Sequence, residues 1–262
     1  MKNYKMILQY EGTRYQGWQK QVSTSNTIQG KLEDILSKMA GYPVEIQGSG
    51  RTDAGVHALR QVANFKLRDT ASDKQETSER QKALPARVEA EDIRSYVNQY
   101  LPEDIRVLEV EEVPERFHSR LNAKEKIYCY RIHHAEVVDV FTRRYTYHYP
   151  QHLNLKAMRG AAKQLCGTHD FKAFCTKKKL KKSTIRTIYE IKIDECGDEI
   201  RITYRGDGFL YHMVRIMTGT LLEIGSGTRE IQDIQRIFDA GIREEAGELV
   251  PGCGLALVDV IY

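Results

Sequence analysis

Residues 48–57 read Gly-Ser-Gly-Arg-Thr-Asp-Ala-Gly-Val-His, a run that combines three glycines with a basic, a hydroxyl, an acidic and an imidazole side chain. Short apolar runs at 43–46 and 61–65 flank it and are typical of strands. The run is therefore predicted to be a loop between two strands, where glycine permits positive φ or close approach to a ligand. The positive charge of Arg51 would favour the ionised form of Asp53 at neutral pH.

The residue types alone leave this loop open to several interpretations. A solvated turn in which Asp53 caps its neighbours is common for such segments. A P-loop is excluded because Lys-Ser or Lys-Thr does not follow, and a dinucleotide-binding fingerprint because a strand follows instead of a helix. The whole run, however, closely resembles the catalytic loop of the TruA family of tRNA pseudouridine synthases. It departs from that loop only at Ser49, where the family usually has alanine.

Further segments resemble the same family in the same order along the chain. They are Gly-Thr and Gly-Trp-Gln within 12–19, Phe-His at 117–118, Tyr-x-Tyr at 128–130, Gly-Thr-His-Asp-Phe at 167–171 and His-Met-Val-Arg at 212–215. One departure lies at 249–251, where Leu-Val-Pro replaces the usual Thr-Ala-Pro before Gly-Leu. The resemblance thus covers most of the chain.

This resemblance implies roles for five residues. Asp53 would be the catalytic carboxylate, Arg215 would keep it charged and oriented, and Arg51 would move RNA aside or bind phosphate. Tyr128 would stack on the extruded uracil, and Leu255 would line the base pocket. From the pattern alone, tyrosines two residues apart on a strand face are more often core residues. A lone helical arginine is usually a surface residue.

Basic side chains supply the candidate RNA contacts. A lysine run is usually a solvated loop, but in an RNA-binding protein it can follow the phosphate backbone. The candidates are Lys177, Lys178, Lys179, Lys181, Lys182 and Arg14.

Bulk composition sets wide limits on function. Forty basic against thirty-six acidic residues give a net charge of +4, which neither demands nor excludes a nucleic-acid partner. Five cysteines without C-x-x-C spacing argue against a disulfide framework or a structural zinc site. Apolar runs long enough for a secretion signal or a membrane span are missing. We therefore expect a cytoplasmic protein with no membrane partner.

The expected fold class is α/β (α+β), because segments with the apolar spacing of helices alternate along the chain with segments that have the spacing of strands. One helix is expected to start with Asn26 as its cap, with Gln29 reaching back, and to stop at Gly41. Another is capped by Asn154, and a hairpin covers 185–204. The helix that follows residue 212 should have an apolar stripe with Arg215 on its other side. One more helix is expected at 231–238, and the last strand at 255–260.

We expect two domains, divided at the compositional break Glu-Glu-Val-Pro-Glu at 111–115. Residues 1–112 would form an N-terminal α/β domain with the catalytic Asp loop. Residues 113–262 would form a C-terminal α/β domain with the active-site tyrosine and arginine. The resemblance implies a pseudouridine synthase fold, in which two similar domains with mixed, largely antiparallel sheets meet at a central RNA-binding cleft. A polar insertion at 69–90 is given no catalytic role.

The reaction implied by the resemblance converts uridine to pseudouridine and involves neither redox change nor net hydrolysis, so no cofactor and no metal are expected. A carboxylate can attack C1′ or remove a proton from C2′ to give a glycal, and the sequence leaves both open. The implied partners are tRNA, with uridines at about positions 38–40 of the anticodon arm, and a second copy of the chain in a homodimer. Two alternatives remain: a catalytically inactive tRNA-binding protein on the same scaffold, and a glycoside or nucleoside hydrolase, which usually needs a second carboxyl group.

Overall fold

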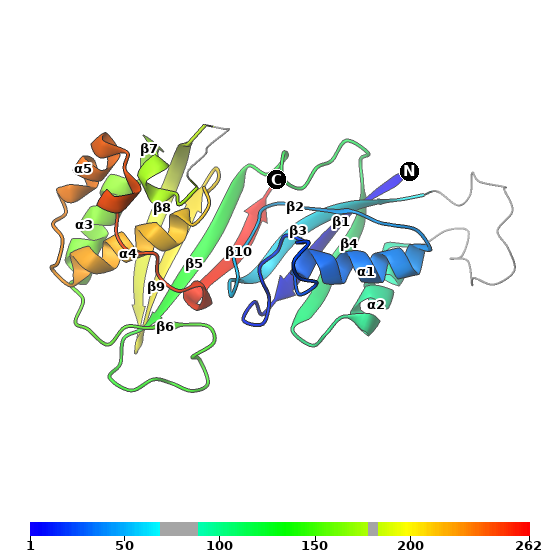
Figure 1. Cartoon of the computed structure of the whole chain (residues 1–262), viewed down its shortest axis with the longest axis horizontal. Helices are drawn as coiled ribbons and strands as arrows, with labels where there is room; N and C mark the ends of the chain where they lie inside the picture. The colour runs from blue at the N-terminus through cyan, green and yellow to red at the C-terminus, as the bar shows by residue number, and fades with distance from the viewer. Residues whose placement is uncertain (69–88, 178–182) are drawn as a thin grey trace, which may run out of the picture. The chain divides into compact units, whose positions relative to one another are not determined.

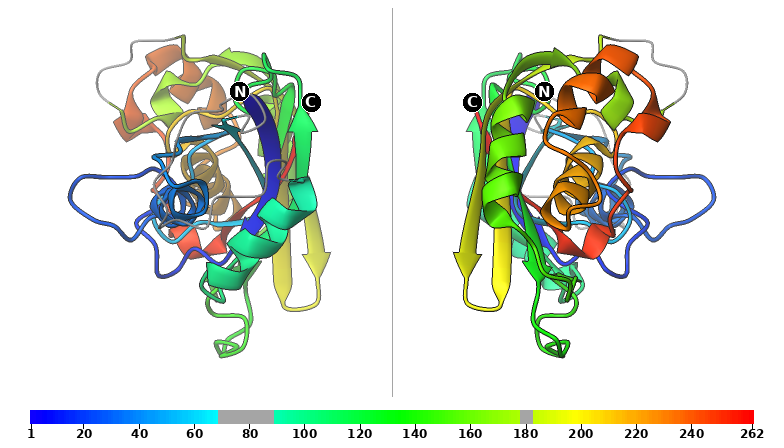
Figure 2. Two further views of the ribbon diagram at one scale, coloured as in Figure 1. Left: turned by 90° about the vertical axis from the view of Figure 1, so that its right-hand side faces the viewer. Right: turned by 90° about the vertical axis from the view of Figure 1, so that its left-hand side faces the viewer.

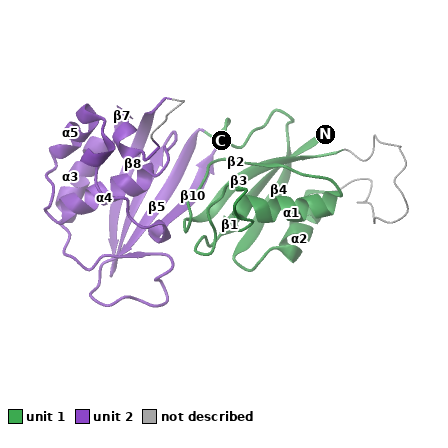
Figure 3. Ribbon diagram, viewed as in Figure 1, with its two compact units in different colours: residues 1–123 green, residues 124–262 purple. Residues whose placement is uncertain are grey.

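The computed structural model describes residues 1–68, 89–177 and 183–262. Within these ranges the chain forms two compact units, Met1–Ala123 and Lys124–Tyr262 (Figure 3). The domain boundary expected after residue 112 falls within a strand whose last residues still pair inside the first unit. Most of the polar insertion at 69–90 lies outside the described residues.

The described strands of the first unit pair with one another in antiparallel fashion. Its central strand β1 (Lys2–Tyr10) pairs with β3 (His57–Leu67) on one side and β4 (Ile105–Val113) on the other. The short strand β2 (Ile46–Gly48) pairs with β3, so the loop that carries Asp53 joins two hydrogen-bonded neighbours. The strand–loop–strand arrangement expected around Asp53 is therefore confirmed.

Two helices pack against these strands (Figure 1). The first, α1 (Ile28–Ala40), buries the apolar residues that recur at helical spacing from Ile28 to Met39. The second, α2 (Ala90–Tyr100), is fixed to β4 by the Asn98 side chain, whose amide donates to the Val107 carbonyl and whose oxygen accepts from the Val107 N–H, both at 2.8 Å. These contacts give the first unit a core between helices and sheet.

The cap of α1 differs from the expected one. Thr27, not Asn26, adopts the extended cap conformation, and its hydroxyl accepts from the Gly30 N–H at 3.2 Å. The Asn26 side chain donates instead to the Arg14 carbonyl, and Gln29 turns inward. Both Asn and Thr are good caps, so tertiary contacts of Asn26 decided between them. The helix ends as expected at Gly41, with φ of 76°.

The second unit is built on five strands in spatial order. They are β10 (Leu255–Ile261), β5 (Glu125–His133), β9 (Glu199–Gly206), β8 (Ile185–Cys196) and β7 (Gly167–Asp170). Each neighbouring pair is antiparallel, and β8 and β9 form the expected hairpin. A further short strand, β6 (Tyr147–His148), runs parallel to β5. The sheet is thus mixed and largely antiparallel, as expected.

Three helices lie on one side of β8 and β9 in the right-hand view of Figure 2. They are α3 (Leu155–Leu165), α4 (Met213–Gly225) and α5 (Asp233–Ala240). Asn154 caps α3 as expected, because its side chain accepts from the Ala157 N–H at 3.0 Å. Among the described residues, no helix is long and apolar enough to cross a bilayer; α1 and α4, at 13 residues each, fall short of the about 20 that a span needs.

Helix α4 is more buried than its sequence pattern indicates. We expected one apolar stripe, but eleven of its thirteen residues are buried. Small residues explain the difference, since a Cβ on Gly219 would lie 2.0 Å from the Glu248 carbonyl oxygen. On another side Thr218 reaches the sheet, its hydroxyl 2.7 Å from that of Tyr204. Arg215 is half-buried on this helix and not a surface residue.

Candidate active site

The loop between β2 and β3 holds Asp53 in a closed turn. The Ser49 N–H donates to the Val62 carbonyl at 2.7 Å and closes the base of the loop. At its tip the Val56 N–H donates to the Asp53 carbonyl at 3.2 Å, and Gly55 has φ of 75°. A positive φ is readily adopted only by glycine. Asp53 is half-buried in this turn.

The segment that contains Gly-Thr and Gly-Trp-Gln supports this turn from one side. The Trp18 N–H donates to the Thr52 carbonyl at 3.0 Å, and the Gly55 N–H donates to the Tyr15 carbonyl at 3.3 Å. Gly17 has φ of 88°, and a Cβ there would lie 2.7 Å from the Thr52 oxygen. These backbone contacts explain why two distant motifs occur together: the first holds the backbone of the second.

The indole of Trp18 lies beneath the start of the loop and is 2% exposed. A Cβ on Gly48 would lie 2.6 Å from its ring, so glycine is needed where the loop leaves β2. His57, at the other end of the loop, is also buried, and its Nδ1 accepts from the Gly12 N–H at 3.0 Å. Accepting this bond requires Nδ1 to be unprotonated. Both side chains therefore fix the loop in place.

A buried polar network lies under the loop. The Ser49 hydroxyl donates to Gln61 Oε1 at 2.6 Å, and Gln61 Nε2 donates to the Gly50 carbonyl at 3.3 Å and to the Tyr10 hydroxyl at 3.4 Å. The Tyr10 and Thr52 hydroxyls are 2.8 Å apart. Burial raises the pKa of Tyr10 to about 12, against the effect of its hydrogen bonds, so its phenol stays neutral. The hydroxyl group of Ser49, which the family's usual alanine lacks, is thus hydrogen-bonded within the protein interior.

In the second unit the two strand tyrosines have different environments. Tyr130 is fully buried and its hydroxyl donates to the Pro251 carbonyl at 2.7 Å. Burial raises its pKa well above the ordinary value. Tyr128 is 8% exposed, and its ring meets that of Phe209 edge-on at 5.1 Å. Tyr130 is therefore a core residue, as the strand pattern alone suggested for both tyrosines, while Tyr128 keeps a small exposed fraction.

Arg215 contacts the loop that departs from the family's Thr-Ala-Pro, and Leu255 follows this loop at the start of β10. Arg215 Nε donates to the Val250 carbonyl at 2.8 Å. Leu255 is 5% exposed and lies opposite Tyr130 in the β10–β5 ladder. Carbonyl groups, not side chains, make the contacts from Val250 and Pro251. These two contacts are therefore compatible with the replacement of threonine by Leu249.

The candidate residues divide between the units. Asp53 and Arg51 belong to the first unit, and Tyr128, Arg215 and Leu255 belong to the second. Their joint action on one substrate stays a prediction.

The candidate RNA-binding residues are only partly described. Arg14 is paired with Asp104 through Nη2 at 2.6 Å and Nε at 2.9 Å, and these bonds raise its pKa. Its side chain is still 61% exposed. Lys177 is exposed. The other four candidates, Lys178, Lys179, Lys181 and Lys182, lie outside the described residues.

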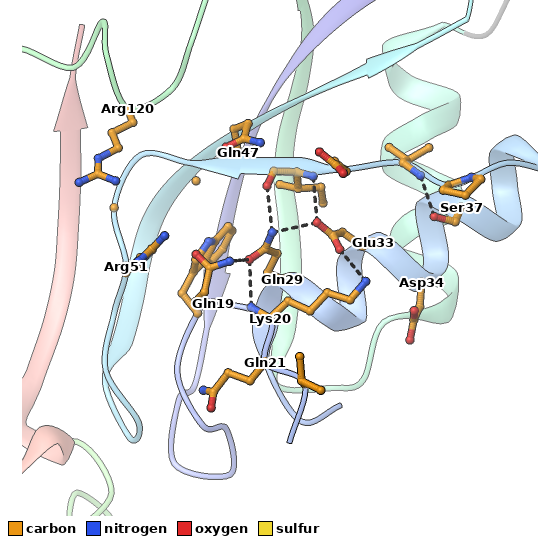
Figure 4. Close-up of a pocket in the computed structure, with 18 residues that line it drawn as sticks. Gln19, Lys20, Gln21, Gln29, Glu33, Asp34, Ser37, Gln47, Arg51 and Arg120 are labelled. Carbon is orange, nitrogen blue, oxygen red and sulfur yellow. Dashed lines mark hydrogen bonds and ion pairs between the residues drawn. The ribbon is translucent and has the colours of Figure 1, made fainter. Parts of the chain in front are cut away.

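A pocket of about 650 Å³ lies beside the Asp53 loop, entirely within the first unit (Figure 4). Its wall is a closed hydrogen-bond network: Gln29 joins Gln19 at 2.7 Å and Glu33 at 2.8 Å, and Glu33 pairs with Lys20 at 3.0 Å. Arg51 lines this pocket together with Arg120. Arg120 was not predicted from the sequence, although its position just after the family-like Phe-His was a signal for it.

All five cysteines lie in the described part of the chain and are free thiols. Among the described residues, no group of three or more His, Cys, Asp or Glu side chains is arranged to hold a metal ion.

Comparison with known proteins identifies the family. The sequence matches the tRNA pseudouridine synthase family over residues 6–122 and 161–262. The chain belongs to this family. A tRNA pseudouridine synthase A of Bacillus sp. (strain KSM-64) is 45% identical over 247 residues, which cover 94% of each chain. A tRNA pseudouridine synthase A 2 of Bacillus cereus (strain ZK / E33L) is 42% identical, and a tRNA pseudouridine synthase A 1 of Clostridium tetani is 44% identical, each over the full length of both chains.

Membership confirms the resemblance seen in the sequence, the fold class and the classification as an isomerase of the tRNA pseudouridine synthase family. The matched residues include the Asp53 loop, its supporting segment and the pocket. The site residues themselves are not tested by these comparisons and remain predictions.

Proposed function

We propose that this protein isomerises uridine to pseudouridine in the anticodon arm of tRNA, and that the Asp53 carboxylate carries out the reaction. Family membership supports the reaction. The observation that carries the assignment of Asp53 is the construction of its loop. Trp18 and Gly17 support the loop from the side, and the Ser49–Gln61 network supports it from below. A carboxylate held this firmly needs little reorganisation when it reacts.

The reaction breaks the N1–C1′ bond, turns the uracil and forms a C5–C1′ bond. The proton on C5 is lost and N1 gains one, so substrate and product are isomers. Asp53 can form a covalent bond to C1′ or remove a proton from C2′. In this proposal Arg215 keeps the carboxylate ionised, Tyr128 stacks on the uracil, and Leu255 lines the base pocket. Stacking supplies about 1–3 kcal/mol per base, which offsets part of the few kcal/mol lost on unstacking.

The finer features of the proposal concern substrate and assembly. The target uridines are those at about positions 38–40, and a homodimer holds the tRNA in the cytoplasm. Exposed basic residues, including Lys177 and Arg14, which is also paired with Asp104, would contact phosphates. Free thiols at all five cysteines are consistent with a reducing compartment.

The test uses Asp53→Asn with Asp198→Asn as a matched control, since Asp198 is an exposed acid at the β8–β9 turn. Pseudouridine is mapped on unmodified tRNA after incubation with each purified protein. We expect Asp53→Asn to lower the rate by at least about 10³-fold while tRNA affinity is kept, because a reacting carboxylate is lost but the fold is not. Asp198→Asn should match the wild type.

Three outcomes would contradict the proposal. Full activity of Asp53→Asn would remove Asp53 from the chemistry. Retention of tRNA by the wild type without any pseudouridine would support an inactive binding protein. Release of free uracil would support a nucleoside hydrolase.

A further inference from the structure

Two arginines line one end of the pocket in the first unit. Arg51 and Arg120 are both exposed and both line the pocket. Among the described residues, neither guanidinium makes a hydrogen bond or ion pair with another group; Arg120 uses only its backbone N–H, which donates to His118 Nδ1. Unpaired guanidinium groups beside a cavity are suited to bind an anion.

We propose that Arg120, together with Arg51, binds a backbone phosphate of the tRNA next to the target uridine, and that the pocket receives the adjoining nucleotide. This inference rests on the proposed function and assigns it a substrate-binding subsite. Arg51 lies two residues before Asp53, and two residues of chain span at most about 7 Å. A phosphate bound at Arg51 therefore belongs to the target nucleotide or to a near neighbour.

Arg120 is held in position by the residue before it. Ser119 is fully buried; its N–H donates to Asn64 Oδ1 at 2.9 Å and its hydroxyl donates to the Gln47 carbonyl at 2.5 Å. Asn64 in turn donates to Asn3 Oδ1 at 3.2 Å. This buried chain of polar contacts fastens the segment before Arg120 to β1, β2 and β3. A guanidinium fixed at its backbone loses less freedom on binding than one on a mobile loop.

The third basic side chain of the pocket is already neutralised, so these two arginines are the groups available to bind an anion. The ammonium of Lys20 is already paired with Glu33, which also accepts from Gln29 and from the Ile46 N–H at 3.1 Å. Figure 4 shows Arg51 and Arg120 at one end of the pocket and Asp34 at the other. A phosphate would be attracted to the first end and repelled from the second.

The shape and lining of the pocket fit a nucleotide. Its volume of about 650 Å³ lies within the range of about 300–1,000 Å³ found for small-molecule sites. The side chains of Gln19, Gln21 and Gln47 line it and offer both donors and acceptors to a base. Guanidinium groups bind phosphate oxygens through paired N–H donors, which a lysine cannot reproduce.

The experiment compares Arg120→Gln, Arg120→Lys and the matched control Arg116→Gln. Arg116 is exposed, lies in the same segment and does not line the pocket. Binding of unmodified tRNA is measured at several salt concentrations with each variant in the Asp53→Asn background, so that turnover does not interfere. Arg120→Gln should weaken binding about 5–20-fold and reduce the slope of log affinity against log salt by about 0.7–0.9, as expected for one lost phosphate contact.

A second measurement locates the contact. Single phosphates around the target uridine in a short anticodon-arm RNA are replaced one at a time by neutral methylphosphonates. We expect one replacement, at or next to the target, to weaken binding by the Asp53→Asn protein strongly. The same replacement should weaken the Arg120→Gln variant less, since only the Arg51 contact is left to lose. Arg120→Lys should keep the salt slope but lose part of the affinity, because it retains charge without the planar fork.

The outcomes separate this inference from the proposed function. If Arg120→Gln and Arg116→Gln weaken binding equally, or if every methylphosphonate acts additively with Arg120→Gln, the subsite does not exist. Either result would leave the proposed function standing when the wild-type protein forms pseudouridine. Absence of pseudouridine with the wild type would overturn the proposed function itself.

Discussion

Gly17→Ala should damage catalysis by displacing the Asp53 loop without touching substrate. Two features of Gly17 make alanine unfavourable at this position. Its φ is 88°, which L residues rarely adopt, and its α-carbon lies so close to the Thr52 carbonyl oxygen that a Cβ would overlap it. The matched control is Gly197→Ala, at the β8–β9 turn, where φ is 61° and a Cβ would meet nothing within 4 Å. Both variants share the backbone strain, and only Gly17→Ala adds a steric overlap.

The magnitudes follow from these geometries. A left-handed conformation costs an L residue about 1–2 kcal/mol, and the lower entropy of alanine in the unfolded chain offsets about 0.4–1 kcal/mol. Gly197→Ala should therefore destabilise the fold by about 0–1.5 kcal/mol. A Cβ on Gly17 would lie 2.7 Å from the Thr52 oxygen, whereas ordinary contact begins at 3.4 Å. Relief of that overlap moves the loop by about 0.7 Å, and overpacking adds about 1–3 kcal/mol.

The assay measures both the stability and the turnover of each variant. Thermal unfolding should show a larger loss for Gly17→Ala, about 1–4.5 kcal/mol in total. Single-turnover pseudouridine formation at a temperature where both variants are folded should fall about tenfold or more for Gly17→Ala, since a misplacement of 1 Å can cost about 100-fold. Wild-type turnover by folded Gly17→Ala, or equal losses in both variants, would refute the claim that this glycine supports the catalytic loop.

Three further variants test other contacts. Ser49→Ala restores the family's usual residue and removes the hydrogen bond to Gln61. It should lower stability by about 0.5–1.5 kcal/mol in chemical denaturation and leave turnover unchanged. A loss of turnover would contradict a purely supporting role. Ser119→Ala should cost about 1 kcal/mol and weaken tRNA binding at low salt, because its bond to the Gln47 carbonyl positions the arginine that follows; unchanged tRNA affinity would contradict this. For Glu199, burial acts to raise the pKa, but hydrogen bonds from its two arginine neighbours outweigh it and lower the pKa from 4.5 to about 2. The charged carboxylate therefore stabilises the fold above about pH 4.5, by about 1–2 kcal/mol after solvent screening, and this contribution is lost as pH falls toward 2. Glu199→Gln should be less stable than the wild type at pH 7 and converge with it near pH 2 in thermal scans; a constant difference would refute the assignment.

Much of the second unit could be predicted from local patterns. The cap at Asn154, the β8–β9 hairpin and the helix after His212 follow from capping chemistry, period-two alternation and period-3.6 apolar spacing. The Asp53 loop and its family were predictable because nine of ten consecutive residues matched a known family loop.

Other features required contacts between residues far apart in the chain. The period-two spacing placed Tyr128 and Tyr130 on one face but did not distinguish them; Phe209 and Pro251 give each its own environment. The apolar stripe of α4 did not indicate burial on nearly every side, which came from segments such as the one around Glu248.

By itself, the sequence determined most of the element types, the family and the candidate carboxylate, because these depend on residues within a few positions of one another. Only the tertiary structure decided that Thr27 and not Asn26 caps α1, that the Ser49 hydroxyl turns inward to Gln61, and that Arg120 shares a pocket with Arg51. The physical reason is the same in each case. A polar side chain takes the partner that folding brings within hydrogen-bond distance, and that partner lies outside the local window from which periodicity and capping are read.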